Sequence, residues 1–332
     1  MKLEKEKSNQ KILITGGAGY IGSILTRQLL AIGFYVRVLD NLRYGGETLV
    51  ELLNQDNFEF MKGDVCSQQD LRNALGGIHG VVHLAAIVGD PACAKEPDLA
   101  IQTNQAATVN LYTLSEKMGV HKFIYASTCS NYGKMAGKDG FLHEDSALNP
   151  VSLYARTKVE SERFLLQQPR SNTCKPVCLR FSTVYGLSPR IRFDLTVNEF
   201  TRELALGREL VVFGGQFWRP YCHVVDLARS IVLVLNHDAG ETAFQVFNVG
   251  DTRENYQKKM LVEEILKLIP DGRVKYVHKD EDPRDYRVSF EKIRNILGFS
   301  ITKTVPDGIK QIADVIRSGM LRNPDDPKFS NI

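Results

Sequence analysis

The sequence predicts an α/β protein: a doubly wound parallel sheet with a smaller, mostly helical C-terminal lobe. Two observations carry this prediction. Short β-rich apolar runs alternate with helical patterns through the first half of the chain. Past about residue 187 the strands become fewer and helical patterns dominate. We therefore expect a first domain over 1–187, joined by a later strand near 244–250, and a substrate-binding lobe over 188–332.

The individual elements follow from hydrophobic spacing. Helical spacing marks 21–33, which ends at a glycine, and the segment 152–168 (SLYARTKVESERFLLQQ). Strands that alternate with helices imply a parallel sheet with both faces covered. The remaining expected elements are strands at 11–15, 35–40, 58–64, 80–86, 122–127 and 210–213, and helices at 194–206, 226–236 and 257–269.

Composition narrows the class of protein. The chain has 332 residues, enough for one large or two medium domains, and a net charge of +3 without a Lys/Arg run. These values do not favour a nucleic-acid partner. No apolar stretch approaches the roughly 20 residues that span a bilayer, and the polar start MKLEKEKSNQ lacks the apolar core of a signal peptide. We expect a cytoplasmic protein without a membrane segment, with reduced cysteines and no metal site.

A glycine loop stands between the first strand and the first helix. Gly16, Gly19 and Gly22 have GxxGxxG spacing around Tyr20 and Ile21. Glycines let the backbone approach a pyrophosphate, and a helix N-terminus offers N–H groups to it. Asp40 ends the second strand, where an acid accepts hydrogen bonds from ribose hydroxyls and repels a 2′-phosphate. The loop predicts a Rossmann-type domain that prefers NAD to NADP, although the nearby Arg43 weakens that preference.

A tyrosine and a lysine suggest the chemistry. Tyr154 and Lys158 are four residues apart and share one face of the expected helix. A phenol with a pKa of about 10 is a poor base at neutral pH, and a neighbouring cation favours its ionised form. Thr128 stands at a strand end, where ligands of parallel sheets bind. Taken alone, these residues fit a surface tyrosine, a solvated lysine and a turn; together with the glycine loop they favour hydride transfer.

A series of motifs runs in order along nearly the whole chain. In this order and spacing it resembles the extended short-chain dehydrogenase/reductase family, specifically its NAD-dependent sugar-nucleotide epimerases and dehydratases. The motifs are TGGAGYIG (15–22), Asp40-Asn41, Gly63-Asp64-Val65, HLAA (83–86), Asn104, STCSNYG (127–133), YARTK (154–158), LRFSTVYG (179–186) and RPYCHVVD (219–226).

The resemblance implies a role for each matched position. Tyr154 would be the base, Lys158 would bind the nicotinamide ribose, and Thr128 would orient the sugar hydroxyl. The implied cofactor residues are Gly16, Gly19, Tyr20, Ile21 and Gly22 for pyrophosphate, Asp40 for the adenosine ribose, Asp64 and Val65 for adenine, Ala85 and Ala86 near nicotinamide, and, without a more specific role, Asn41 and Asn104. The implied substrate residues are Cys129, Ser130, Asn198, Arg219, Arg284 and Tyr286, with the two arginines on the nucleotide diphosphate; a surface ion pair is the alternative for Arg219.

Some positions depart from the family pattern. The 4,6-dehydratases carry Asp-Glu after the threonine, where this chain has Cys129 and Ser130. Because dehydration needs an extra acid and base, it is not expected here. Another branch uses a loop cysteine as acid/base, but Cys129 is out of register with it, and a buried structural cysteine is the simpler interpretation. Thr183 and Leu187 also replace the usual Asn and Pro.

The resemblance then implies hydride transfer at the sugar C4, by a sugar-nucleotide 4-epimerase or 4-dehydrogenase. The alternatives are a keto-sugar reductase and a non-catalytic dinucleotide sensor on the same fold. The segments 87–93 and 188–201 resemble a branch that includes GDP-heptose 4-oxidising enzymes. The family commonly forms homodimers, here expected through helices near 100–118 and 152–168.

Overall fold

A computed structural model describes residues 10–135, 140–282 and 284–331, so most of the polar N-terminal segment lies outside the described residues. The chain divides into two compact units. The first unit comprises Met1–Thr128, Ser152–Arg180 and Ala228–Phe247. The second unit comprises Cys129–Val151, Phe181–Leu227 and Asn248–Ile332.

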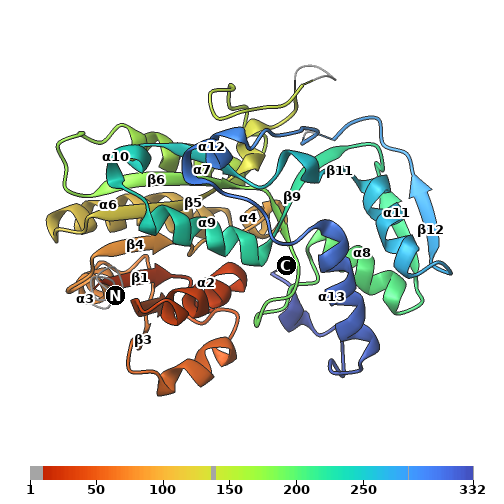
Figure 1. Ribbon diagram of the computed structural model, residues 1–332, viewed down its shortest axis with the longest axis horizontal. Helices are drawn as coiled ribbons and strands as arrows, with labels where there is room; N and C mark the ends of the chain where they lie inside the picture. Colours follow the sequence, from red (N-terminus) through yellow and green to blue (C-terminus); the bar gives the residue numbers. More distant parts are fainter. Residues whose placement is uncertain (1–9, 136–139, 283, 332) are drawn as a thin grey trace. The chain divides into compact units, whose positions relative to one another are not determined.

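The first unit is built on a seven-stranded sheet with the order β10-β6-β5-β4-β1-β2-β3 (Figure 1). The pairs β1–β2, β2–β3, β1–β4 and β4–β5 are parallel. The chain moves outward from β1 in one direction through β3 and then returns to β4 on the other side, which creates a topological switch point beside β1. The strands are β1 Lys11–Thr15, β2 Tyr35–Asp40, β3 Phe58–Lys62, β4 Gly80–His83, β5 Lys122–Thr128, β6 Lys175–Phe181 and β10 Val246–Val249.

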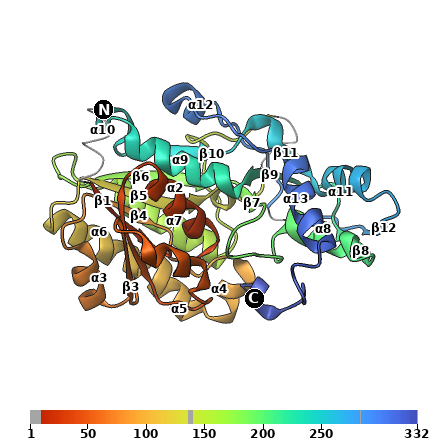
Figure 2. The ribbon, with the colours of Figure 1, turned by 60° about the horizontal axis from the view of Figure 1, so that its bottom comes forward.

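Helices flank this sheet, as Figures 1 and 2 show, and the expected Rossmann-type α/β fold is confirmed. The core beneath them is apolar and includes Leu13, Leu71, Leu111 and Phe123. The helices are α2 Tyr20–Ala31, α3 Gln68–Leu75, α4 Asp90–Lys95, α5 Pro97–Ile101, a π-helix Gln102–Ala106, α6 Ala107–Lys117, α7 Leu153–Leu166, α9 Val224–Asn236 and α10 Ala239–Thr242.

The second unit has a core of its own around Tyr185, Val197, Leu210, Leu261 and Ile309. It holds a three-stranded sheet, β11-β9-β7, and a parallel pair, β12-β8. Its strands are β7 Thr183–Tyr185, β8 Glu209–Phe213, β9 Trp218–His223, β11 Asn255–Gln257 and β12 Arg273–Val277. Its helices are α8 Thr196–Ala205, α11 Lys258–Leu268, α12 Glu291–Leu297 and α13 Val305–Arg317.

Several details differ from the expected elements. β3 and β4 end at Lys62 and His83, before the ends expected at 64 and 86, because the following residues form loops at the carboxyl edge of the sheet. β6 was not expected as a strand, since its sequence KPVCLRF contains a proline and a buried arginine. Within the described ranges, no helix has the length and apolar character needed to cross a membrane.

The unit boundaries also differ from a single break at residue 187. The segment Cys129–Val151 joins the second unit because Leu142 N donates to Arg287 O, and Ser289 N donates to Leu142 O. The segment Ala228–Phe247 returns to the first unit, where Phe244 N donates to Pro176 O. These bonds connect residues more than 60 positions apart, which no local pattern reveals.

Candidate active site

The glycine loop has the geometry of a phosphate-binding turn. Gly16 adopts a φ of +76°, and its N–H donates to Leu39 O over 2.9 Å. A Cβ on Gly22 would lie 2.2 Å from Gly16 O, so the loop can pack this tightly only with glycine there. Helix α2 begins at Tyr20, and no side chain caps its N-terminus. Its first N–H groups and the positive end of its dipole therefore suit a pyrophosphate.

Asp40 is the acid at the end of β2. Its carboxylate accepts hydrogen bonds from Ala18 N (3.0 Å) and Leu42 N (2.9 Å), so it is fixed beside the glycine loop. Burial raises the pKa of Asp40, and the two backbone bonds partly offset that effect. Arg43, which could have favoured a 2′-phosphate, forms an ion pair with Glu96. The arrangement fits the ribose of NAD.

Asp64 and Val65 follow β3 on the same edge of the sheet. Burial alone would raise the pKa of the Asp64 carboxyl, but hydrogen bonds from Cys66 and Asn41 hold it below its usual value. Asn41 Nδ2 lies 3.2 Å from Asp64 Oδ2, so two of the expected cofactor residues are in direct contact. Val65 is buried and packs into the apolar core.

The loop after β4 is held from two sides. His83 bonds through Nδ1 to Thr15 Oγ1 (2.7 Å) and through Nε2 to Thr108 Oγ1 (3.0 Å). Burial, with a smaller effect from Lys158, lowers the pKa of His83 to about 3, so the ring is neutral at physiological pH. A Cβ on Gly16 would lie 2.8 Å from Ala85 N, so the loop carrying Ala85 and Ala86 lies against the glycine loop.

Asn104 lies in the π-helix and is 1% exposed. Its Oδ1 accepts from Ile87 N (2.8 Å), and its Nδ2 donates to Ile87 O (3.0 Å). Both ends of the amide therefore hold the backbone one residue beyond Ala86. The structure thus connects Asn104 to the cofactor region through the loop that it fixes.

Tyr154 and Lys158 lie on α7, whose N-cap residue Ser152 accepts from Ala155 N. Lys158 is 3% exposed, and its Nζ donates to Ala126 O over 2.8 Å. The ammonium lies 5.8 Å from the centre of the Tyr154 ring. Burial lowers the pKa of Lys158 to about 8, although Cys93 and Glu162 act in the opposite direction. Thr128, the last residue of β5, lies two residues beyond the carbonyl that holds this lysine.

A buried ion pair behind this group was not predicted. Glu162, four residues after Lys158, accepts from Arg180 Nη2 (2.8 Å) and Nε (3.1 Å) and from the hydroxyl of Ser127. The side chain of Arg180 is 4% exposed and that of Glu162 is 2% exposed. The spacing of Glu162 from Lys158 indicates a shared helix face, but Arg180 comes from a strand that the sequence did not reveal. The pair ties α7 to β5 and β6.

In the second unit, Cys129 and Ser130 open the turn Cys129–Tyr132. Cys129 is 1% exposed, and its Sγ lies 4.0 Å from Asn248 Oδ1, which also accepts from Tyr132 O–H over 2.7 Å. This burial agrees with a structural cysteine. All six cysteines are free.

Asn198 is completely buried in the second unit. Its Oδ1 accepts from Gly186 N (2.9 Å), and its Nδ2 donates to Arg192 O (2.8 Å) and Gly186 O (3.3 Å). These bonds explain the residue as a support of the turn at Gly186. The predicted role of Asn198 in substrate contact stays a prediction, because these hydrogen bonds are all internal to the protein.

Three other predicted substrate residues gather in the second unit. The Arg219 guanidinium lies 5.5 Å from the centre of the Tyr286 ring and forms a 2.8 Å ion pair with Asp282. Arg284 Nε lies 3.9 Å from the other oxygen of Asp282. Tyr286 is 2% exposed, and burial raises its pKa to about 12. The sequence indicated the arginines but neither Asp282 nor the nearby Lys258.

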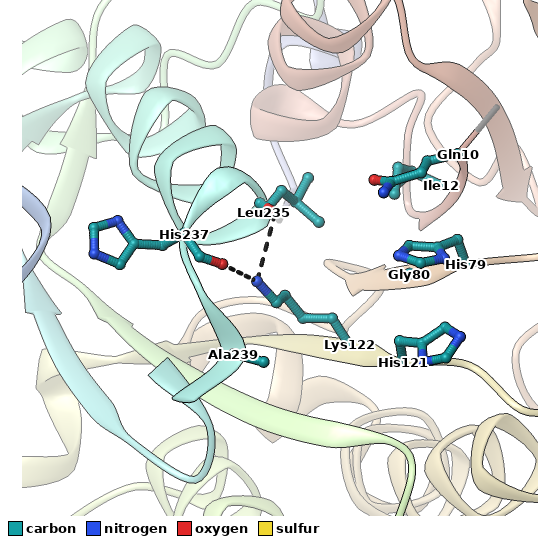
Figure 3. A pocket seen from close by; sticks show the side chains of 9 residues that line it. All are labelled: Gln10, Ile12, His79, Gly80, His121, Lys122, Leu235, His237 and Ala239. Carbon is teal, nitrogen blue, oxygen red and sulfur yellow. Dashed lines mark hydrogen bonds between the residues drawn. The ribbon is translucent and has the colours of Figure 1, made fainter. Parts of the chain in front are cut away.

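A pocket of about 300 Å³ lies at the amino ends of β1, β4 and β5 (Figure 3). The glycine loop, by contrast, follows the carboxyl end of β1. Lys122 Nζ donates there to Val234 O (2.7 Å) and His237 O (2.8 Å). The lysine thus meets the carbonyls at the C-terminus of α9, where the helix dipole favours a cation. Burial lowers the pKa of Lys122 to about 8. We assign this lysine to capping α9.

The doubly wound sheet and the groups at its carboxyl edge define the class of this protein, which is a Rossmann-type dinucleotide-binding enzyme. The model of the NAD dependent epimerase/dehydratase family matches residues 12–250, and the chain belongs to that family. The expected cofactor, NAD, is confirmed as the cofactor of the family.

Relatives with different reactions cover nearly all of the chain. A dTDP-glucose 4,6-dehydratase of Streptomyces niveus is 30% identical and aligns over 95% of this chain and 97% of its own. The structure of UDP-glucuronic acid 4-epimerase from Bacillus cereus, in complex with UDP-glucuronic acid and NAD, has a TM-score of 0.83 at 26% identity, over 93% of this chain and 99% of that one. The dTDP-glucose 4,6-dehydratase from Streptomyces venezuelae, with NAD and TYD bound, has a TM-score of 0.83 at 28% identity, over 96% and 100%. The reaction, the sugar, the homodimer and the GDP-heptose branch stay predictions.

Proposed function

We propose that this chain transfers a hydride at C4 of a nucleotide-linked sugar, as a sugar-nucleotide 4-epimerase or 4-dehydrogenase. The observation that carries the proposal is the buried ammonium of Lys158, which is bonded to Ala126 O and lies 5.8 Å from the centre of the Tyr154 ring and 4.8 Å from that of Tyr125. A cation at this position favours the ionised phenol, the form that accepts a proton. Thr128 ends the strand that carries Ala126 and supplies a hydroxyl to orient the sugar oxygen.

In the proposed reaction, Tyr154 takes the proton from the C4 hydroxyl, and the C4 hydrogen leaves as hydride. NAD, bound on the glycine loop, would supply the hydride acceptor. Lys158 would hold the nicotinamide ribose and balance the charge on the phenolate. When the ketone is reduced from its other face, Tyr154 returns the proton and the product is the C4 epimer; when the ketone leaves, the enzyme is a dehydrogenase.

Dehydration is the competing reaction, because a 4,6-dehydratase is 30% identical to this chain. Eliminating water across two carbons needs an acid and a base in addition to Tyr154. At the positions where the dehydratases carry Asp-Glu, this chain has the thiol of Cys129 and the hydroxyl of Ser130. The missing carboxylates support oxidation and reduction at one carbon.

Product analysis tests the proposal. The purified protein is incubated with UDP-, dTDP-, GDP- and CDP-sugars, and products are identified by NMR. We expect a C4 epimer or a 4-ketone. We also expect Tyr154→Phe to lose about 10²–10⁴ of the turnover rate while NAD binding is retained.

Tyr35→Phe is the matched control, because Tyr35 is 40% exposed and lies outside the predicted site. Unchanged turnover in Tyr154→Phe would contradict the assigned base. A 4-keto-6-deoxy product would assign dehydration in place of epimerisation.

A further inference from the structure

Arg43 and Glu96 form an ion pair at the carboxyl edge of the large sheet. The Arg43 guanidinium donates through Nη2 to Glu96 Oε1, and through Nη1 to Glu96 Oε2 over 3.4 Å. The two side chains are 37% and 35% exposed, so water partly screens the contact and the pair adds little to stability. An effect of the pair on function must therefore come from its position.

The pair joins two segments on either side of the glycine loop. Arg43 lies three residues beyond β2, and Glu96 lies between α4 and α5 in the connection that follows β4. In the sheet, β1 lies between β2 and β4, and the glycine loop follows β1. Arg43 and Glu96 thus meet at the edge where a dinucleotide is expected to bind.

The turn that carries Arg43 is fixed beside Asp40. Leu42 N donates to Asp40 Oδ1 over 2.9 Å, and Arg43 N donates to Asn41 Oδ1 over 3.1 Å. Gly45 N donates to Leu42 O over 3.0 Å, and Leu42 has a φ of +61° that non-glycine residues rarely adopt. The backbone therefore holds Arg43 close to the acid that is predicted to accept the ribose hydroxyls.

An arginine just past this acid suits a 2′-phosphate. In dinucleotide-binding folds, the acid bonds the ribose 2′-hydroxyl of NAD, and a nearby arginine accommodates the 2′-phosphate of NADP. A guanidinium can bind phosphate oxygens in pairs. Arg43 has the residue type and the position for that contact, but Glu96 occupies both of its terminal nitrogens.

Glu96 dominates the electrostatic surroundings of Arg43. Hydrogen bonding to Glu96 raises the pKa of Arg43, burial opposes this effect, and the phenol of Tyr44 adds to it. The guanidinium carbon also lies 5.9 Å from the centre of the Tyr44 ring. In the part of the chain that the structure describes, Glu96 is the one carboxylate that forms an ion pair with Arg43. Removing this carboxylate would release the guanidinium for another anion.

We infer that Glu96 is a cofactor-specificity residue, which keeps the Arg43 guanidinium engaged and so prevents it from binding the 2′-phosphate of NADP. Asp40 repels that phosphate, and Glu96 withholds the arginine that would otherwise attract it. Discrimination between the two cofactors then uses a repulsive group and a withheld attractive one. The inference rests on the predicted ribose position beside Asp40, and it is independent of the sugar reaction.

The test measures how the full-length protein distributes between NAD and NADP. Protein is equilibrated with both nucleotides at increasing excess of NADP, unbound nucleotide is removed by rapid gel filtration, and bound nucleotide is quantified by chromatography. We expect Glu96→Ala to raise the affinity for NADP relative to NAD about 5- to 30-fold, as for one charge-assisted hydrogen bond in a partly exposed site. NAD should still bind more tightly, because Asp40 is unchanged. If Glu96→Ala does not fold, Glu96→Gln, which removes the charge and keeps the length, takes its place.

Glu51→Ala is the matched control. Glu51 pairs with Arg27 over 2.8 Å in the same unit. Without the carboxylate, Arg27 is still held by Ser23 O and Thr48 O, each at 2.7 Å, so no guanidinium is released. This variant should distribute between the two nucleotides as the parent does.

Arg43→Met separates the two ways in which Glu96 could act. In the Arg43→Met background, Glu96→Ala should give no gain in NADP affinity, because no guanidinium remains to be released. A gain of the same size in that background would overturn the inference, since Glu96 would then repel the phosphate directly.

An unchanged nucleotide ratio in Glu96→Ala would also refute the assigned role, as would an equal gain in Glu51→Ala, which would assign the effect to net charge. The measurement needs no nucleotide sugar, so the two proposals can fail separately. If the ratio shifts as expected and no nucleotide sugar is converted, the proposed function alone is refuted.

Discussion

The buried pair of Glu162 and Arg180 permits a quantitative test of how the first unit holds its lysine helix. Arg180 contacts both carboxylate oxygens, at 2.8 Å through Nη2 and at 3.1 Å through Nε, and both side chains are almost fully buried. Glu162→Gln leaves the guanidinium buried without its counter-charge. Removing one partner of such a pair costs about 3–5 kcal/mol of unfolding free energy. Arg180→Met should cost a similar amount.

The double variant Glu162→Gln/Arg180→Met should lose much less than the sum of the single losses, because neither charge is stranded. Urea unfolding is followed by far-UV circular dichroism, since the single tryptophan, Trp218, lies in the second unit. Glu160→Gln is the control: Glu160 pairs with Arg163 on the same helix, both side chains are about half exposed, and the expected loss is at most about 1 kcal/mol. A loss below about 1 kcal/mol for Glu162→Gln, or additive single losses, would refute this reasoning.

Two further outcomes concern the cofactor edge of the sheet. Burial lowers the pKa of Lys158 to about 8, so kcat/KM should fall as pH rises through about 8. Lys158→Met should remove this alkaline fall from the pH profile of kcat/KM. If the fall is unchanged in the variant, it belongs to the titration of another group. From pH 8 to 10.5 the unfolded chain keeps a proton on Lys158 that the folded chain has lost, so the contribution of this residue to stability rises with pH there. Gly22→Ala places a Cβ 2.2 Å from Gly16 O and should weaken NAD binding about 5- to 150-fold, as a shift of the loop costs about 1–3 kcal/mol. In the control Gly76→Ala the new Cβ would lie 3.8 Å from Asn73 O, an ordinary contact, and NAD titration should give the parent affinity. Equal affinities for both variants would show that the loop relaxes freely.

Local patterns in the sequence were sufficient for the fold class and the cofactor loop. The apolar run at 11–15, the glycines from Gly16 to Gly22 and the acid at Asp40 lie within one β-α-β unit, where the chain itself sets their order in space. The four-residue separation of Tyr154 and Lys158 likewise fixes a shared helix face. Such short-range periodicities survive in the sequence because each is determined by the backbone geometry of one element.

The tertiary structure alone decided what these groups touch. Lys158 is held by Ala126 O, 32 positions away, and Glu162 by Arg180, on a strand whose proline and arginine hid it from the sequence pattern. Asp282 meets Arg219 from a segment 63 positions further along the chain. These contacts depend on how strands and helices pack, and no periodicity encodes which charge will be buried beside which. The sequence by itself therefore determined the fold class, the cofactor loop and the Tyr154/Lys158 pair. Tertiary packing determined which charged groups are buried and which partner holds each of them.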